Sequence, residues 1–442
     1  MSVALCLIAF VLTFFAGRTS RLAGLVTTLA IGYVYGIVRA NVTETFSHFI
    51  FDFAVLGFYV TQFSRRLDAN QQLRIRQLKS WLLLLIGWPV ILFMVPVQDW
   101  LVQLIGLRGN VFLLPFLVVG ALLEPEERYR LAIWLAALNI AAFIFAVVQF
   151  FVGVEPFFPR NEVTYLIYKS KDVAQSTAYR IPSFFNNSHS YAGAITVTLP
   201  LLVSALVQRH RRAFSPRLLV VGIVATLLGI LIAAARTPVI LAGAIILFTT
   251  FSLRSRVSYV VGWVLILGVV GWIGSSEERL QRFTTLSDTD SVAERLSGSV
   301  NMRFIDLAEM RPFGNGLGGG GTSMPYWMER QIHDPVAIEN EYGRIMLEQG
   351  LIGLFFWLTF LLWAFGRYFF DPNEKWDFGR KLALVACGAQ FLTSFTGTGM
   401  LTAIPATCVL FLLMGWITSS TVVNDGLETA RLSPQVPALE SV

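Results

Sequence analysis

The chain has 442 residues, of which 55% are hydrophobic and only 14% are charged. A soluble domain carries about 25% charged residues, so the composition excludes an ordinary soluble protein and indicates a chain that crosses a membrane several times. The formal charge of +6 comes from lysines and arginines in short segments between apolar runs, which is not the basic surface of a nucleic-acid-binding protein. The three cysteines lie in apolar segments and the four histidines are far apart, so we expect neither disulfides nor a local zinc motif.

Apolar runs long enough to span a bilayer follow one another along most of the chain. A transmembrane helix needs about 20 apolar residues, or fewer where the bilayer is thin. We predict thirteen spans, with twelve or fourteen as alternatives, and the first and fifth are short. They are residues 2–17, 22–38, 46–63, 80–97, 110–123, 131–152, 191–207, 218–234, 239–253, 257–274, 343–365, 382–396 and 400–418.

The basic residues of the short loops predict the orientation, because such loops are enriched in lysine and arginine on the cytoplasmic side. The span list places four basic loops on one side of the membrane, which is therefore predicted to be cytoplasmic. These loops carry Arg65, Arg66, Arg74, Arg76 and Lys79; Arg209, Arg211, Arg212 and Arg217; Arg254 and Arg256; and Arg367, Lys375, Arg380 and Lys381. The N-terminus is then outside and the C-terminal tail inside.

These features predict an all-α polytopic membrane protein in four parts. They are a bundle of about ten spans (1–274), a long outside loop that contains helices (275–342), C-terminal spans (343–418) and a polar tail that we expect to be disordered (419–442).

The long outside loop contains a second kind of helical pattern. Ser291 to Glu294 has the form of a capping box. Apolar residues then repeat at helical spacing from Val292 to Leu307. This pattern predicts an amphipathic helix that lies on the membrane, covers the mouth of a cavity, or packs on other loops. The glycine run from Gly314 to Gly321 lacks the lysine of a P-loop, so we interpret it as a flexible turn that permits close backbone approach to a substrate.

One arginine interrupts an apolar run of 36 residues. Arg236, followed by Thr237 and Pro238, lies between Leu218 and Leu253, where two spans meet in a tight outside turn. A charge at membrane depth costs several kcal/mol, about 3 or more, and usually faces a cavity or a partner. The alternative is an arginine whose side chain extends to the membrane surface.

The outside segments hold the groups that suit chemistry on a phosphorylated lipid. Arginine binds phosphate oxygens in a bidentate manner and keeps its proton, so Arg180 and Arg236 could clamp a lipid-linked diphosphate. His333 and Glu339 could take a proton from an incoming hydroxyl. Glu348 either fixes the start of the following span or lines a cavity.

His48 and Asp52 stand one turn apart in an apolar span and therefore share a face. We interpret them as a buried polar pair, with contact to a proton or a substrate as the alternative.

Three segments resemble the superfamily of O-antigen ligases and Wzy-type polymerases of O-antigen and exopolysaccharide. They read RIPSFFNNSHSYAGAITVTLPLL from Arg180, AAARTPVILAGAIILF around Arg236, and RPFGNGLGGGG followed by ENEYGRIMLEQGLIGLFFW. They are similar, in this order, to the family's arginine segment before a span, its arginine turn between two spans, and its glycine turn with the His-Asn…Glu-x-Gly ending. The likeness in span number and outside loop covers most of the chain.

The resemblance implies a GT-C-like fold and a metal-independent membrane glycosyltransferase without a cofactor. The donor would be a glycan on undecaprenyl diphosphate at the periplasmic face of the bacterial inner membrane. A chain-length regulator is a possible partner. Arg180 and Arg236 would bind the diphosphate, and Arg303, Asn340 and Glu348 would be secondary substrate contacts.

One position departs from the family pattern. The family's histidine, the proposed base of the ligases, is replaced here by Glu339, while Asn340 and Glu348 keep their spacing. A carboxylate can serve as a base where burial raises its pKa, and His333 is the other candidate. We therefore favour a polymerase of repeat units over a ligase that transfers glycan to lipid A-core. A lipid-glycan flippase and a non-catalytic assembly protein are the other interpretations.

Overall fold

The computed structural model describes residues 1–169, 179–208, 216–252, 262, 309–321, 324–336, 340–370 and 376–419. The predicted amphipathic helix, the tail after Ser419 and all of the predicted tenth span except Gly262 lie outside these residues. Regular secondary structure in the described part of the chain is helical, as predicted.

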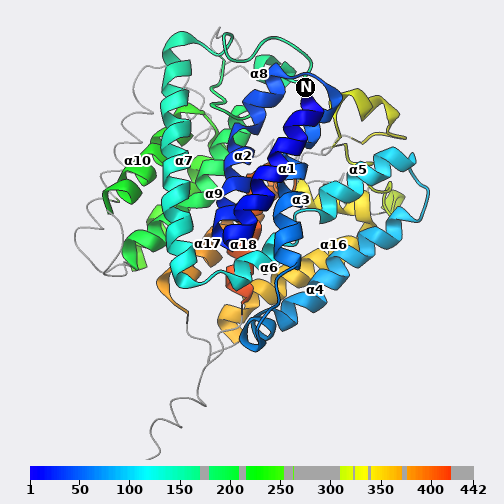
Figure 1. Ribbon diagram of the computed structural model, residues 1–442. Helices are drawn as coiled ribbons and strands as arrows, with labels where there is room; N and C mark the ends of the chain where they lie inside the picture. Colours follow the sequence, from blue (N-terminus) through cyan, green and yellow to red (C-terminus); the bar gives the residue numbers. More distant parts are fainter. Residues whose placement is uncertain are drawn as a thin grey trace, which may run out of the picture.

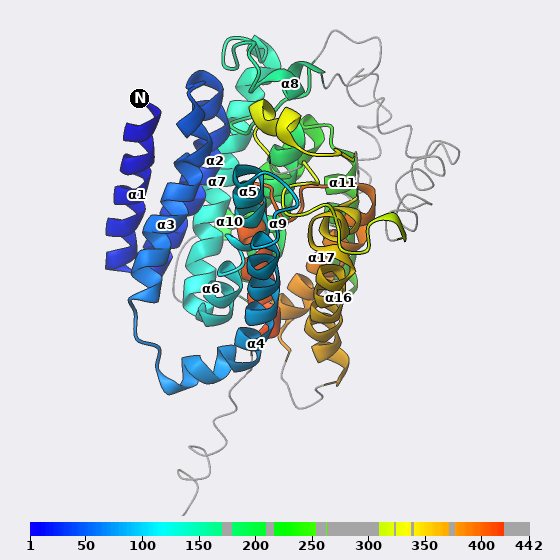
Figure 2. The same ribbon diagram turned by 90° about the vertical axis from the view of Figure 1, so that its right-hand side faces the viewer.

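Most of the long helices run side by side along one direction, as Figures 1 and 2 show from two sides. The elements are α1 (Ser2–Thr19), α2 (Arg21–Asn41), η1 (Thr45–Phe49), α3 (Ile50–Phe63), α4 (Ala69–Phe93), α5 (Trp100–Val111), α6 (Phe116–Leu122), α7 (Pro125–Val152), α8 (Tyr165–Lys169), α9 (Ser188–Val207), α10 (Pro216–Ile232), α11 (Arg236–Ser252), η2 (Tyr326–Gln331), α16 (Glu341–Phe370), α17 (Phe378–Thr393), η3 (Ser394–Thr396) and α18 (Ala406–Thr418).

Eight segments among the described residues are long and apolar enough to cross a membrane. They are α1, α2, η1 with α3, α4, α5 with α6, α7, α9 and α16. The apolar helices α10, α11 and α18 are shorter. The first two lie within three residues of the predicted spans 218–234 and 239–253, whereas α18 begins at Ala406, six residues after the predicted start of span 400–418. The protein is thus a multi-pass α-helical membrane protein, whose lipid-facing backbone groups are satisfied within each helix.

The fifth span is longer than the prediction of 110–123. It begins with α5, and the whole segment Trp100–Leu122 is long enough to cross a membrane. The added turns contain Gln103 and Arg108, which find partners inside the protein. The side chain of Gln103 accepts two backbone hydrogen bonds at 3.0 and 3.1 Å, and Arg108 pairs with Asp52. Polar groups are tolerated in a span when protein partners replace water.

The fourth span also begins earlier than predicted, because α4 starts at Ala69. Asp68 caps this helix: its Oδ1 accepts a hydrogen bond from the backbone N–H of Gln71 at 2.7 Å, and the Gln71 side chain accepts one from the Asp68 N–H. The predicted basic loop is therefore helical at Arg74 and Arg76.

Arginines cap the carboxyl ends of several helices at one end of the bundle. Arg65 donates to the carbonyl of Gly17 at 2.6 Å, and Arg21 donates to that of Leu122 at 2.9 Å. The last carbonyls of a helix lack partners and carry partial negative charge, so a guanidinium stabilises them.

The first and fourth predicted basic loops meet at this end. Arg367 donates to the carbonyl of Thr418 at 2.8 Å, and Arg380 donates to that of Ser419 at 2.6 Å. Arg74 and Arg380 both lie within electrostatic reach of Arg128. We call this end of the bundle the basic end and the opposite one the polar end.

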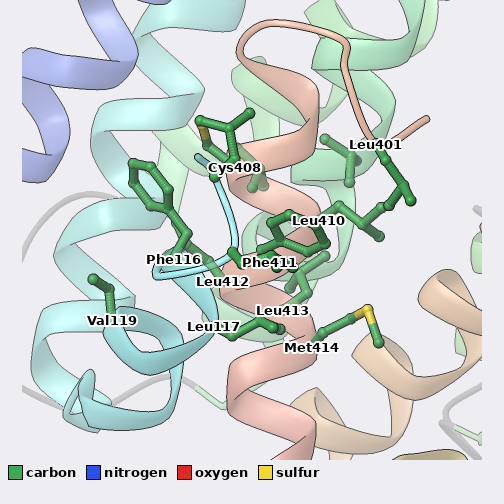
Figure 3. Packing of buried hydrophobic residues seen from close by; sticks show 14 of the residues in the cluster. Phe116, Leu117, Val119, Leu401, Cys408, Leu410, Phe411, Leu412, Leu413 and Met414 are labelled. Carbon is green, nitrogen blue, oxygen red and sulfur yellow. The ribbon is translucent and has the colours of Figure 1, made fainter. Parts of the chain in front are cut away.

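The packing of α6 against α18 brings two helix backbones into direct contact (Figure 3). A Cβ atom added to Gly415 would lie 2.0 Å from the carbonyl oxygen of Leu117, and one added to Gly120 would lie 2.1 Å from that of Leu412. Small residues allow such close approach, which is how helices associate within a membrane.

Candidate functional site

The segment before α9 carries Arg180 at the polar end. Arg180 is buried, and its Nη1 lies 2.8 Å from Nε2 of His189 in the first turn of α9. Asn187 caps this helix, because its Oδ1 accepts a hydrogen bond from the Ser190 N–H at 2.7 Å. The arginine is thus held beside a helix N-terminus, where anions bind favourably.

Helix α2 fixes the path of this segment. The Ile37 N–H donates to the carbonyl of Phe184 at 2.8 Å. A Cβ atom on Gly36 would lie 2.3 Å from the backbone nitrogen of Asn186, so only glycine permits this approach. Ser183 adopts a φ of 52°, and its hydroxyl donates to the carbonyl of Ala142.

Arg236 is the first residue of α11 and follows a tight turn after α10, as predicted. Ala234 turns the chain with a φ of 51°, and the alanines on either side of it are buried. Ala235 and Ile181 belong to one buried apolar cluster, so the segments of Arg236 and Arg180 pack into the same part of the protein.

His333 lies on the surface of the loop before α16, and 62% of its side chain is exposed. Its Nε2 is 3.8 Å from Oδ1 of Asp99. Its backbone is held by Gln98, which accepts from the His333 N–H at 2.8 Å and donates to its carbonyl at 3.1 Å. The other proposed base, Glu339, and the secondary contact Arg303 lie outside the described residues.

Asn340 caps α16 from a buried position. Its Oδ1 accepts a hydrogen bond from the Gly343 N–H at 2.6 Å. The spacing that matches the family motif therefore also has a local structural role at this helix start.

Glu348 belongs to a fully buried group of charges on α16, which we call the α16 charge cluster: Glu341, Arg344 and Glu348. Arg344 donates to Glu341 and to Glu348, each at 2.8 Å. Asn110 of α5 donates to Glu348 at 2.6 Å. The other end of the cluster is tied to the connection before α18, whose Gly399 N–H donates to Glu341 at 2.7 Å.

Our sequence interpretation missed Arg344 and Asn110. Arg344 stands three residues after Glu341 and four before Glu348, the spacing of one helix face, which is the signal that identifies this cluster. Asn110 carries no such signal, because it is 238 residues from Glu348 in the chain.

The glycine turn packs on a break in α16. Gly350 has a φ of 69° and a ψ of −177°, which interrupts the helix. The turn supplies the missing partners: the Asn315 N–H donates to the carbonyl of Leu347 at 2.5 Å, and the carbonyl of Pro312 accepts from the Leu351 N–H at 2.9 Å. The close approach that we predicted for the glycines is therefore made to α16 within the protein.

A second pair of arginines, which the sequence analysis did not select, lies at the polar end. Arg108 of α5 donates two hydrogen bonds to the carboxylate of Asp52, at 2.7 and 2.8 Å. Arg39 of α2 has its Nη2 3.4 Å from Nε2 of His48. His48 and Asp52 are both buried, as predicted, but each faces an arginine from another helix. The available signal was Arg39 on the side predicted to be outside, against the usual bias. Arg108 lies before the predicted span 110–123, so the hydropathy pattern gave no signal for it.

Within the described ranges, no group of three or more His, Cys, Asp or Glu side chains has the arrangement of metal ligands. A comparison with models of protein families and a search of curated proteins found no match for this chain.

Proposed function

We propose that this protein is a GT-C-like membrane glycosyltransferase that polymerises oligosaccharide repeat units carried on undecaprenyl diphosphate. One observation carries the proposal. Arg180, buried beside His189, and Arg236, at the start of α11, lie on segments that pack into one apolar cluster. The active site would face the periplasm from the inner membrane, with the basic end in the cytoplasm.

The two arginines suit the electrostatic need of the reaction. The acceptor hydroxyl oxygen attacks the anomeric carbon of the donor, the bond from that carbon to the diphosphate oxygen breaks, and undecaprenyl diphosphate leaves with the bonding electrons. Negative charge grows on the leaving group, and preorganised guanidinium groups stabilise it without reorganisation.

The hydroxyl proton needs an acceptor, and His333 and Glu339 are the two candidates. His333 is exposed, so it can reach a substrate at the loop surface. Arg303 and Asn340 would contribute secondary contacts. Glu348 and its partner Arg344 are both fully buried, so Glu348 would act by holding this part of α16 in place.

The test uses purified protein in lipid bilayers with an undecaprenyl-diphosphate oligosaccharide repeat from the host. A ladder of products on a gel is expected for the wild type, with loss for Arg180→Ala and Arg236→Ala. Arg160→Ala is the matched control, since Arg160 is an exposed arginine of the segment before α9 that pairs with Glu155. The relative loss in His333→Ala and Glu339→Ala identifies the base.

Two other outcomes replace the polymerase. Transfer only when lipid A-core is added would make the protein an O-antigen ligase. Movement of labelled lipid-linked glycan across the bilayer without any product would make it a flippase.

A further inference from the structure

The second arginine pair carries more positive charge than its partners among the described residues balance. Arg108 pairs with the carboxylate of Asp52, whereas Arg39 has no carboxylate partner among the described residues. Both guanidinium groups lie within electrostatic reach of the His48 ring. Within the described part of the chain, this group therefore has an excess of positive charge in either protonation state of His48.

The ion pair of Arg108 with Asp52 has an ordinary structural explanation, because it joins α5 to α3. Arg39 has none. Its Nε is buried, and no described residue accepts a hydrogen bond from it. Arg108 remains 28% exposed, and its bonds to Asp52 use Nε and Nη2, so Nη1 points to no acceptor among the described side chains.

An uncompensated cation of this kind is costly near a membrane unless an anion joins it. Donors from two guanidinium groups suit the several oxygens of a phosphate or diphosphate. Leu104, four residues before Arg108 in α5, and Phe46, two residues before His48 in η1, are exposed by 43% and 53%, and exposed apolar side chains suit a lipid chain. The chemistry of this place therefore fits a phosphorylated lipid.

Helix α2 separates this pair from the Arg180 segment. Tyr35 and Arg39 are four residues apart, and the Tyr35 hydroxyl donates to the carbonyl of His48 at 3.0 Å, so this face points to η1. The neighbouring face, at Gly36 and Ile37, contacts the backbone that follows Arg180. Two arginine sites thus flank one helix, whose diameter is about 10 Å.

We propose that Arg39 and Arg108 hold the diphosphate of the second lipid-linked glycan, the acceptor, while Arg180 and Arg236 hold that of the donor. This inference rests on the proposed function, because a polymerase must bind two lipid-linked substrates at once. The acceptor diphosphate stays intact in the reaction; the site only positions the far end of the acceptor glycan for attack.

The first experiment counts lipid diphosphates bound to the full-length protein in zwitterionic nanodiscs, with farnesyl diphosphate as the probe. We expect two molecules for each wild-type chain, and one at the same concentration for Arg39→Gln, with at least tenfold weaker binding at the second site. Arg39→Gln leaves no carboxylate unpaired, and an unchanged unfolding midpoint confirms that it folds. Arg160→Gln, the matched control, retains two.

Several results would overturn the acceptor site. They are one molecule bound to the wild type, two bound to Arg39→Gln, or displacement of the second molecule by phosphatidylglycerol or by inorganic pyrophosphate at equal concentration. Displacement by phosphatidylglycerol would assign the site to an anionic phospholipid, and displacement by pyrophosphate would assign it to a free anion. None of these binding results depends on catalytic turnover. Loss of the acceptor site can therefore be told apart from absence of glycosyltransferase activity.

The second experiment separates donor from acceptor. The donor has a blocked terminal hydroxyl, and the acceptor glycan is supplied either on a lipid diphosphate or on an uncharged octyl group. Arg39→Gln is expected to raise KM for the diphosphate-linked acceptor at least tenfold and to leave KM for the donor and the octyl acceptor unchanged. An equal rise for both acceptors would contradict the assignment.

Discussion

The α6–α18 contact and the α16 charge cluster hold helices together in opposite ways. The first uses glycine: Gly120 and Gly415 let two backbones touch, and the surrounding side chains are apolar (Figure 3). The second uses charge: Arg344 bridges Glu341 and Glu348 in complete burial. Buried charge is costly, and it is found here beside the glycine turn and the break in α16.

The comparison predicts that the charge cluster is more sensitive to a single change than the glycine contact. Arg344→Met leaves Glu341 and Glu348 as buried carboxylates without their cation. The expected loss of unfolding free energy is about 3–5 kcal/mol, as for other broken buried pairs. The measurement is denaturant or thermal unfolding of the purified protein in detergent.

Arg130→Met is the matched control for this change. Arg130 pairs with Glu126 at 2.9 Å, but both side chains are about half exposed. Such surface pairs contribute about 0.5 kcal/mol or less. Equal losses of unfolding free energy in the two variants would mean that Glu341 and Glu348 do not need the charge of Arg344 to be buried.

The glycine contact is tested by Gly415→Ala. The new Cβ would meet the backbone oxygen of Leu117, which cannot move without separating α6 from α18. We expect a loss of about 2–3 kcal/mol, in the range for an overpacked core. Gly388→Ala in α17 is the control, since no atom lies within 4 Å of its Cβ position. It should be neutral or stabilising by up to about 1 kcal/mol through helix propensity.

The break in α16 lies between these two cases and is tested by Gly350→Ala. The φ of 69° disfavours any side chain, and the Cβ would lie 2.9 Å from the backbone of Phe313. Phe313 is 77% exposed, so little of the protein packs on the outer side of the glycine turn there, and we expect a loss of about 1–2 kcal/mol. Hydrogen exchange at the Asn315 and Leu351 amides should become faster. Unchanged exchange at both amides would show that the turn does not depend on the break.

The smallest expected effect on stability is that of Glu44, an exposed carboxylate. Glu44 accepts hydrogen bonds from the backbone N–H and the hydroxyl of Ser2, and these bonds lower its pKa from 4.5 to about 2. A lowered pKa means that the stabilisation is complete above the unfolded pKa and is lost as the pH falls through the folded one.

The difference in unfolding midpoint between wild type and Glu44→Gln should therefore be constant from pH 7 to about 5. It should shrink between pH 4.5 and 2. A difference that persists unchanged at pH 2 would show that the carboxylate charge is not what joins α1 to the α2–η1 turn.

Much of the fold could be predicted because a membrane helix is recognisable from the hydropathy of its own residues. The predicted spans 191–207 and 239–253 coincide with α9 and α11 within three residues, and the arginine turn at Arg236 was found from one charge in an apolar run. A helix that crosses the lipid bilayer needs about 20 consecutive apolar residues, and a run of that length can be found without knowing the rest of the fold.

The starts of α4 and α5 were missed for the opposite reason. The polar residues there looked unsuitable for a span. In α5 their partners on other segments make them suitable, whereas the polar first turns of α4 follow the Asp68 cap and are largely exposed. Asp52 is 56 residues from Arg108, and Asn110 is 238 residues from Glu348. Sequence periodicity compares neighbours on one helix, so it cannot identify partners on different helices.

The sequence by itself therefore determined the membrane class, most span positions and the candidate residues Arg180, Arg236 and His333, because hydropathy and residue chemistry are local properties. Only the tertiary structure decided which charges meet. It buried Glu348 against Arg344, docked the glycine turn on the break in α16, and gathered Arg39 and Arg108 across α2 from Arg180. These pairings follow from the packing of whole helices, in which a charge is stable only where a distant segment completes it.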